Sequence, residues 1–141
     1  MKINWNDFIE VALDAYPEEA CGFLFSRKPY DPQEEWFVFS VENLSSKPLN
    51  SWRPNKDELR MVKKRAMDIG LTRIGNIHTH PYFDDCDIEK LLLPSKIDLS
   101  YAKRYNDAIR GIMVVSKNAI YGIKFHDKFG NIIPVELEEF K

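Results

Sequence analysis

Apolar residues recur at three- and four-residue spacing near the start of the chain, which is the pattern of one buried face of an amphipathic helix. This face consists of Trp5, Phe8, Ile9, Ala12, Leu13 and Tyr16. Pro17 prevents the helix from continuing, so we predict a helix over 5–16. Two short runs rich in aromatic or β-branched residues follow at 20–26 and 36–41, with a proline-containing loop between them. Such runs predict two adjacent strands, most simply a hairpin.

A second helix is predicted from residue 55 to about residue 70. Asn55, followed three residues later by Glu58, resembles a capping box, and Gly70 suits the position after a helix C-terminus. The residues expected to face inward are Leu59, Val62, Ala66 and Ile69.

The second half of the chain contains more strands and one more helix. A strand at 74–80 ends at Pro81, and Pro94–Ser95 starts a third helix that is expected to reach about residue 108. Three further strands, separated by turn residues, are expected at 111–116, 120–125 and 132–137. Because we find no repeat or domain linker, the pattern predicts one α/β domain over 1–141, with helices packed on a sheet.

Composition and charge exclude several classes of protein. The 141 residues have a formal net charge of -2, so there is no overall basic field that would bind nucleic acid. The apolar stretches are far shorter than the roughly 20 residues that span a bilayer, and the polar, acidic start does not resemble a signal peptide. We therefore expect a cytoplasmic protein without nucleic-acid or membrane partners, whose oligomeric state the sequence leaves open.

The cysteines exclude a cysteine-based zinc site. Cys21 and Cys86 lie far apart and form no Cys-x-x-Cys motif, so a metal would be held by histidine and carboxylate side chains. We expect Cys21 to be a small buried apolar residue. Cys86 lies in an acidic segment, and three interpretations stay open for it: exposure, pairing with Cys21, or approach to a metal. His126, next to a predicted turn, is expected at the surface.

Two histidines at the end of the strand at 74–80 are the first candidates for chemistry. His78 and His80 are two residues apart, so both side chains point to the same face of a strand. Downstream, Asp98 belongs to the only Ser-x-x-Asp sequence of the chain and would lie in the first turn of the third helix. Two imidazoles and one carboxylate suit Zn²⁺, which in catalytic sites keeps a further position for water. Ser95 and Asp98 also form a possible capping box, which needs no metal.

A general base is needed to take a proton from such a water. Glu18 and Glu19 lie at the entrance to the strand at 20–26, and either carboxylate can serve.

Three segments together resemble the JAMM (MPN+) metalloproteases of prokaryotic, stand-alone type. They are Pro-Glu-Glu-Ala-Cys-Gly-Phe-Leu at 17–24, Gly-Asn-Ile-His-Thr-His-Pro at 75–81 and Pro-Ser-Lys-Ile-Asp-Leu at 94–99. The resemblance implies an α/β (α+β) fold of the MPN/cytidine-deaminase-like kind, in which a mixed sheet is flanked by helices. It also implies zinc-dependent hydrolysis of isopeptide or peptide bonds after the C-terminus of ubiquitin-like or sulfur-carrier proteins.

The resemblance assigns a role to each motif residue. His78, His80 and Asp98 correspond to the zinc ligands. Glu19 corresponds to the general base that activates water together with zinc, in preference to Glu18. Ser95 corresponds to the residue that stabilises the oxyanion.

The chain departs from the family pattern in one place. Fourteen residues, 81–94, separate His80 from Ser95, whereas the family usually has about half as many. The added residues are acidic in one part and apolar in another. They would form an enlarged loop next to the site, acting as a lid, as a substrate-reading loop or as a block.

Three alternatives compete with this function. A catalytically inactive MPN scaffold would bind partners, but such proteins usually lack motif residues that this chain contains. A RadC-like relative associated with DNA is disfavoured by the acidic charge balance. A zinc deaminase requires a Pro-Cys-x-x-Cys element, which is missing.

Overall fold

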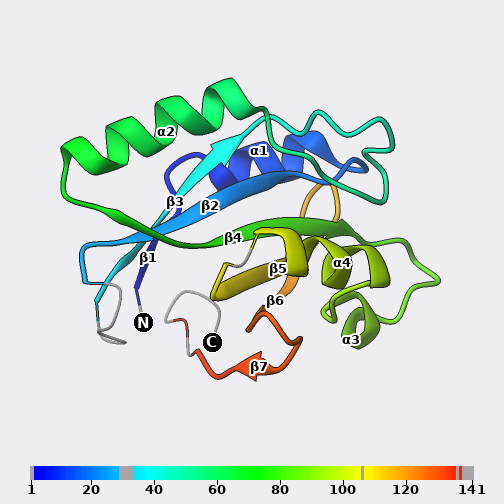
Figure 1. Ribbon diagram of the computed structural model, residues 1–141. Coiled ribbons are helices and arrows are strands. Elements are labelled where there is room, and N and C mark those ends of the chain that lie inside the picture. Colours follow the sequence, from blue (N-terminus) through cyan, green and yellow to red (C-terminus); the bar gives the residue numbers. More distant parts are fainter. Residues whose placement is uncertain (1, 29–33, 106, 136, 138–141) are drawn as a thin grey trace.

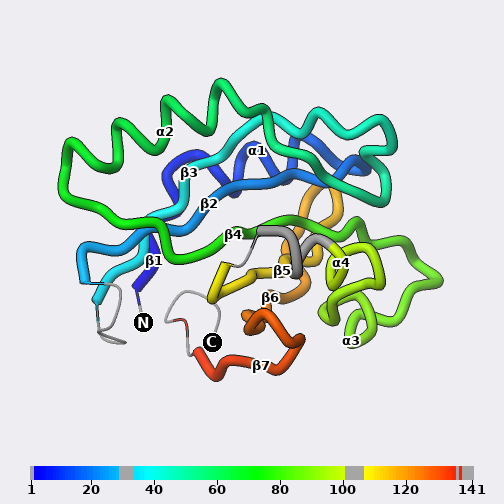
Figure 2. Tube along the Cα trace, in the orientation of Figure 1, coloured from blue at the N-terminus to red at the C-terminus, as the bar shows by residue number. Residues whose placement is uncertain are grey.

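A curled sheet of seven strands organises the part of the chain that the computed structural model describes, residues 2–28, 34–105, 107–135 and 137 (Figures 1 and 2). The strands are β1 (Ile3–Asn4), β2 (Cys21–Ser26), β3 (Trp36–Val41), β4 (Thr72–Pro81), β5 (Ile109–Val115), β6 (Ile120–His126) and β7 (Ile132–Ile133). The helices are α1 (Phe8–Ala15), α2 (Lys56–Asp68), α3 (Ile88–Leu91) and α4 (Lys96–Tyr105).

The sheet is mixed, with the strand order β1-β3-β2-β4-β5-β6-β7. The pairs β1/β3 and β4/β5 are parallel, and the other neighbours are antiparallel. The predicted hairpin is confirmed as β2/β3, and the three predicted C-terminal strands pair in sequence order as an antiparallel meander. The chain crosses from β4 to β5 through α3 and α4, and Figure 1 shows these helices near the C-terminal end of β4.

Strand β2 lies inside the hydrophobic core, and every one of its residues is buried. Its side chains alternate between two apolar clusters, because successive residues of a strand point to opposite faces. Leu24 belongs to the cluster that includes Phe8 of α1. Phe23 and Phe25 belong to the cluster that includes Ala66 of α2. The two helices therefore cover opposite faces of β2, and Figure 1 shows α2 lying along the sheet there.

The predicted second helix is confirmed as α2. The side chain of Asn55 caps it by accepting hydrogen bonds from the backbone N–H groups of Asp57 and Glu58. The carboxylate of Glu58 accepts from the backbone N–H of Glu42 at 2.7 Å, which ties α2 to the end of β3. Ile69, expected to face inward, is instead 49% exposed, because it is the C-cap residue beyond the last helical turn.

Several boundaries differ from the predicted ones. The first helix begins only at Phe8, because Ile3–Asn4 pair with β3 and Asn6 has a φ of 51°. Helix α4 is shorter than predicted, and the four-residue helix α3 is an element that the sequence pattern does not predict. Strand β7 is shorter than the predicted 132–137, of which residue 136 lies outside the described residues. Among the described residues, no helix has the length and apolar character needed to cross a membrane.

Gly75 marks a close approach between β4 and β5. A Cβ atom at this position would lie 2.1 Å from the backbone oxygen of Ile109. We expect Gly75→Ala to lower the free energy of unfolding by about 1–3 kcal/mol or more, since the backbone must shift to accept the methyl group. Urea denaturation measures the loss. Gly122→Ala is the matched control, because its Cβ would meet only the flexible Leu92 side chain at 3.3 Å. Equal midpoints for Gly75→Ala and the wild type would contradict this pairing of β4 with β5.

Candidate metal centre

The two motif histidines lie on β4 and are both buried. His78 is 3% exposed and His80 is 7% exposed. Cys21 of β2 lies opposite His78 in the antiparallel ladder, and Ile112 of β5 lies opposite it on the other side. Because β4 is paired along both edges, hydrogen bonds hold the backbone under the histidines from two sides.

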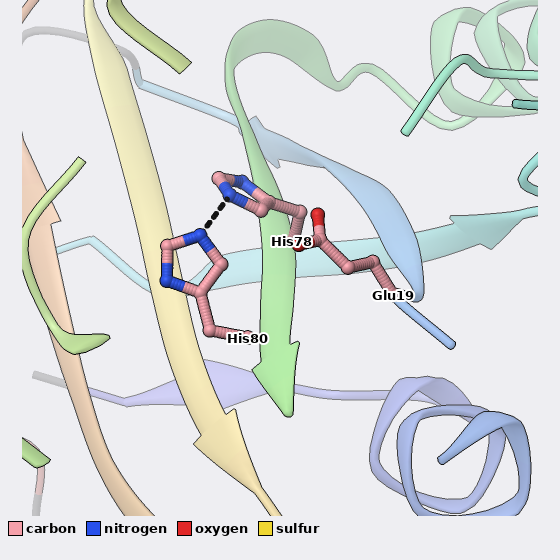
Figure 3. A group of neighbouring side chains, drawn as sticks. All are labelled: Glu19, His78 and His80. Carbon is pink, nitrogen blue, oxygen red and sulfur yellow. Dashed lines mark hydrogen bonds between the residues drawn. The ribbon is translucent and has the colours of Figure 1, made fainter. Parts of the chain in front are cut away.

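Glu19 reaches the histidines from the segment that leads into β2 (Figure 3). Its neighbour Ala20 exchanges two hydrogen bonds with Thr79. The backbone N–H of Ala20 donates to Thr79 Oγ1 at 2.8 Å, and the backbone N–H of Thr79 donates to the carbonyl of Ala20 at 2.9 Å. The N–H of Glu19 donates to the carbonyl of Pro48 at 2.6 Å. These bonds fix Glu19 beside the residue that separates the two histidines.

Two ring nitrogens and the carboxylate of Asp98 form a compact group of possible ligand atoms. Nε2 of His78 lies 3.1 Å from Nε2 of His80 and 3.1 Å from Oδ1 of Asp98. Nε2 of His80 lies 3.1 Å from Oδ2 of Asp98. Tetrahedral zinc with ligands at about 2.0–2.1 Å places neighbouring ligand atoms about 3.3 Å apart. The three groups therefore fit a zinc ion in both chemistry and spacing.

The carboxylate of Glu19 lies next to this group. One of its oxygens is within 4.8 Å of ring nitrogens of both histidines. Its Oε1 is buried, and no described residue provides a hydrogen-bond partner for it. Figure 3 shows the carboxylate directed toward His78. A carboxylate in this position can act on a water molecule held between it and the imidazoles, which is the geometry that a general base needs.

Asp98 comes from the first turn of α4. Its Oδ2 accepts a hydrogen bond from the N–H of Ser95 at 2.8 Å, and the Ser95 hydroxyl accepts from the N–H of Asp98 at 3.1 Å. This reciprocal pair confirms the capping box that the sequence allowed. The same oxygen of Asp98 contacts His80, so the cap also orients the carboxylate toward the histidines.

The enlarged loop at 81–94 contributes to the site through its backbone. The carbonyl of Leu91, in α3, accepts a hydrogen bond from Nδ1 of His80. Because a carbonyl only accepts, Nδ1 holds the proton, and Nε2 keeps its lone pair toward Asp98 when the ring is neutral. The hydroxyl of Tyr16 donates to the carbonyl of Tyr82 at 2.7 Å, which anchors the start of the loop. Its exposed acidic residues are Asp84, Asp85, Asp87 and Glu89.

Burial and mutual charge shift the pKa values of three site residues. Burial raises the pKa of Glu19, and the nearby imidazoles oppose this only in part. Burial would lower the pKa of His80, but the hydrogen bond and charge of Asp98 outweigh it and raise the pKa. Burial would raise the pKa of Asp98, but the two histidines outweigh it and hold that pKa well below its usual range. At neutral pH Asp98 is therefore a carboxylate suited to a cation, while Glu19 keeps an increased affinity for a proton.

These shifts predict how the stability of the metal-free protein depends on pH. Glu19 and His80 both have raised pKa values when folded, so their contributions are present at low pH and are lost as the pH rises through the folded values. Asp98 has a lowered pKa, so its contribution is lost only in strong acid. Relative to the double variant Glu19→Gln/His80→Gln, we expect the stability of the wild type in chelator to fall as the pH rises from weakly acidic to weakly basic values. Urea midpoints across this range measure it, and a difference that grows with pH would contradict the assignment.

Trp52 and His126 lie near His78. Sequence reasoning does not identify Trp52, and it places His126 wrongly. Trp52 is buried, and its ring stacks on His78 with centroids 5.6 Å apart and an interplanar angle of 23°. It lies in a loop without periodicity, so no pattern identifies it. The expectation that His126 lies at the surface is wrong, because its side chain is 1% exposed. The turn after β6 packs against the start of α4, where Gly130 lies close to Leu99.

Neither cysteine belongs to the group of possible metal-ligating residues found in the described part of the chain. The expectation for Cys21 is confirmed, because it is fully buried and its thiol donates to the carbonyl of Val41 at 3.4 Å. This burial raises the pKa of the thiol. Cys86 is partly exposed and does not pair with Cys21.

Comparison with known proteins identifies a family and several structures with the same fold. Residues 3–126 match the Prok-JAB family, described as prokaryotic homologs of the JAB domain. The crystal structure of a JAB1/MPN domain protein from Archaeoglobus fulgidus has a TM-score of 0.57 and 20% identity, over 97% of this chain and 98% of that one. Structures from Desulfitobacterium hafniense and Salinibacter ruber each have a TM-score of 0.61, at 21% and 24% identity. These two matches cover 98% and 97% of this chain and 93% and 90% of theirs.

At these identities the solved structures show a shared fold. No protein with a curated description matches the chain by sequence. The family match spans every motif residue, from Glu19 to Asp98. The JAB/MPN fold and the cluster of Glu19, His78 and His80 together support a JAMM-type metallohydrolase family. The chain belongs to the Prok-JAB family of prokaryotic JAB-domain homologs.

Proposed function

We propose that this protein is a zinc metalloprotease that cleaves the isopeptide or peptide bond following the C-terminus of a ubiquitin-like or sulfur-carrier protein. One observation supports it most strongly: two imidazole nitrogens and the Asp98 carboxylate converge at 3.1 Å spacing. Beside them lies the buried Oε1 of Glu19, for which none of the described residues provides a hydrogen-bond partner. The resemblance to the JAMM metalloproteases, whose motif residues the chain contains, supports the class of bond.

The residues around the site divide the chemistry between them. Zinc held by His78, His80 and Asp98 would supply a Lewis acid that polarises a carbonyl oxygen and makes water more acidic. Glu19 Oε1 is placed to accept the proton that the attacking water loses. The raised pKa of Glu19 keeps that proton available, and the carboxyl group then donates it to the leaving amine nitrogen.

Ser95 is suited to stabilise the oxyanion that forms on the attacked carbonyl group. Its oxygen accepts from the N–H of Asp98, so the hydroxyl hydrogen remains available for a second partner. The side chain is exposed at the start of α4, next to a proposed zinc ligand. A hydrogen bond to charge that develops only in the transition state is worth on the order of 3 kcal/mol.

The proposal is tested by cleavage of defined linkages. Zinc-loaded protein is incubated with a panel of ubiquitin-like and sulfur-carrier proteins, each joined at its C-terminus to a short peptide or to a lysine side chain. Intact mass spectrometry then identifies the bond that is cut. We expect cleavage directly after the carrier's C-terminal residue by the wild type and none by Glu19→Gln. A zinc-loaded wild type that binds carriers but cuts no linkage would instead identify an inactive scaffold.

A further inference from the structure

His126 lies on the same face of the sheet as the candidate zinc ligands. The register gives two neighbouring rows of side chains across β4, β5 and β6: Asn76–Arg110–His126 and His78–Ile112–Lys124. Residues two positions apart along a strand share a face. The last residue of β6 is therefore on the His78 face, one row away, although the two histidines are 48 positions apart in the sequence.

A small cavity is lined by His78 and His126. Its volume is about 20 Å³, and its polar wall also includes Asn76, Arg110 and Asp98. A space of about 10–15 Å³ on this measure holds one water molecule, provided that two to four polar groups surround it. The cavity thus has the size and the lining that a single ordered water requires.

Two residues that line the cavity carry buried ring nitrogens. Nδ1 of His78 and both ring nitrogens of His126 are buried, and no described residue meets full hydrogen-bond geometry with them. A weaker contact with the backbone of Arg110 involves one nitrogen of His126 and leaves the other open. Burial lowers the pKa of His126, although the backbone of Arg110 opposes the shift. A neutral imidazole has one N–H donor and one acceptor nitrogen. It can therefore donate a hydrogen bond to a water molecule or accept one from it.

We propose that His126 is a positioning residue for His78, and that one water molecule in this cavity links the His126 ring to Nδ1 of His78. The inference rests on the proposed role of His78 as a zinc ligand. A metal-binding histidine almost always donates its second ring N–H to a carboxylate, a carbonyl or water, which fixes its tautomer and orientation. His80 has the carbonyl of Leu91 for this purpose. The water held by His126 gives His78 the equivalent partner.

Zinc affinity tests the proposal. His126→Phe fills the space with a ring that cannot bind water, whereas His126→Gln keeps a donor and an acceptor. By competition with a chromophoric chelator, we expect His126→Phe to bind zinc about 10–100-fold more weakly than the wild type, and His126→Gln to recover most of the affinity. The matched control is Phe125→Leu, which alters a buried ring on the opposite face of β6 and leaves zinc affinity unchanged.

A spectroscopic measurement separates positioning from simple packing. In zinc-loaded wild type, the Nδ1–H proton of His78 should give an NMR signal that exchanges slowly and shows a contact with a long-lived water. In His126→Phe this signal should broaden or disappear, although the protein stays folded. If His126→Phe does not fold, the proposal is tested by the contact between the Nδ1–H proton of His78 and a long-lived water in the wild type. Its absence, or unchanged zinc affinity in folded His126→Phe, would overturn the inference.

The outcome is separable from that of the proposed function. A wild type that binds zinc but cleaves no carrier linkage would reject the protease and leave the role of His126 intact. A wild type that binds zinc with the same affinity as His126→Phe, yet cleaves, would reject only the role of His126. A wild type that binds no zinc would overturn both.

Discussion

Glu19→Gln is expected to lower the rate of bond cleavage by about 10²–10⁴-fold while the protein keeps its zinc. Glutamine has nearly the same shape as glutamate but cannot take up a proton. The three proposed zinc ligands remain, so metal content should match that of the wild type. Steady-state kinetics on a cleaved carrier fusion, with elemental analysis of the same sample, measures both quantities.

Glu18→Gln is the matched control for this prediction. Glu18 is the neighbouring carboxylate, and it is exposed, whereas Glu19 is 4% exposed. The Glu18 variant should cleave at the wild-type rate. The assignment of the general base would be wrong if Glu18→Gln lost activity and Glu19→Gln retained it.

Asp98→Asn is expected to weaken zinc binding by more than about 100-fold, beyond the 10–100-fold effect of changing an outer hydrogen-bond partner. The amide keeps the shape of the side chain and can still accept the hydrogen bond from Ser95, so α4 keeps its cap. What is lost is the negative charge between the two imidazoles. Titration with zinc against a chromophoric chelator measures the change.

Ser95→Ala separates the ligand from the cap. It removes the hydroxyl that accepts from the N–H of Asp98 and leaves the carboxylate in place. We expect it to lower stability by about 0.5–2 kcal/mol while zinc affinity stays close to that of the wild type. If Ser95→Ala loses as much zinc affinity as Asp98→Asn, the loss reflects disruption of the helix start and not the removal of a ligand.

The candidate ligands can be recognised from the sequence because local rules place them. Alternation along a strand puts His78 and His80 on one face, and a capping box puts Asp98 in the first turn of a helix. Glu19 is different. Its approach to the histidines depends on the pairing of β2 with β4, in which Cys21 lies opposite His78, far away in the sequence, and no periodicity encodes that pairing. The resemblance to a family therefore distinguishes Glu19 from Glu18, and the structure shows why only Glu19 is buried.

The errors have physical causes as well. His126 precedes a turn, which favours exposure, but the turn folds back against the start of α4 and covers it. Helix α3 has only four residues, which is too short for a helical period to show. Its one local signal is Asp87, whose side chain accepts from the N–H of Glu89 as an N-cap. Ile69 fits the helical spacing of α2 but lies beyond its last turn, where spacing no longer determines burial.

The pairing of Ala20 with Thr79 has an evolutionary consequence. Glu19, His78 and His80 lie on neighbouring segments joined by backbone hydrogen bonds, so the spacing of the sheet sets their separation. Only Asp98 arrives through a long connection. Insertions and deletions between residues 81 and 94 would therefore leave Glu19 in place relative to the two histidines, provided that the loop still brings the Leu91 carbonyl to His80 and α4 to the site. The length of this loop can therefore change while the sheet keeps the spacing of Glu19, His78 and His80.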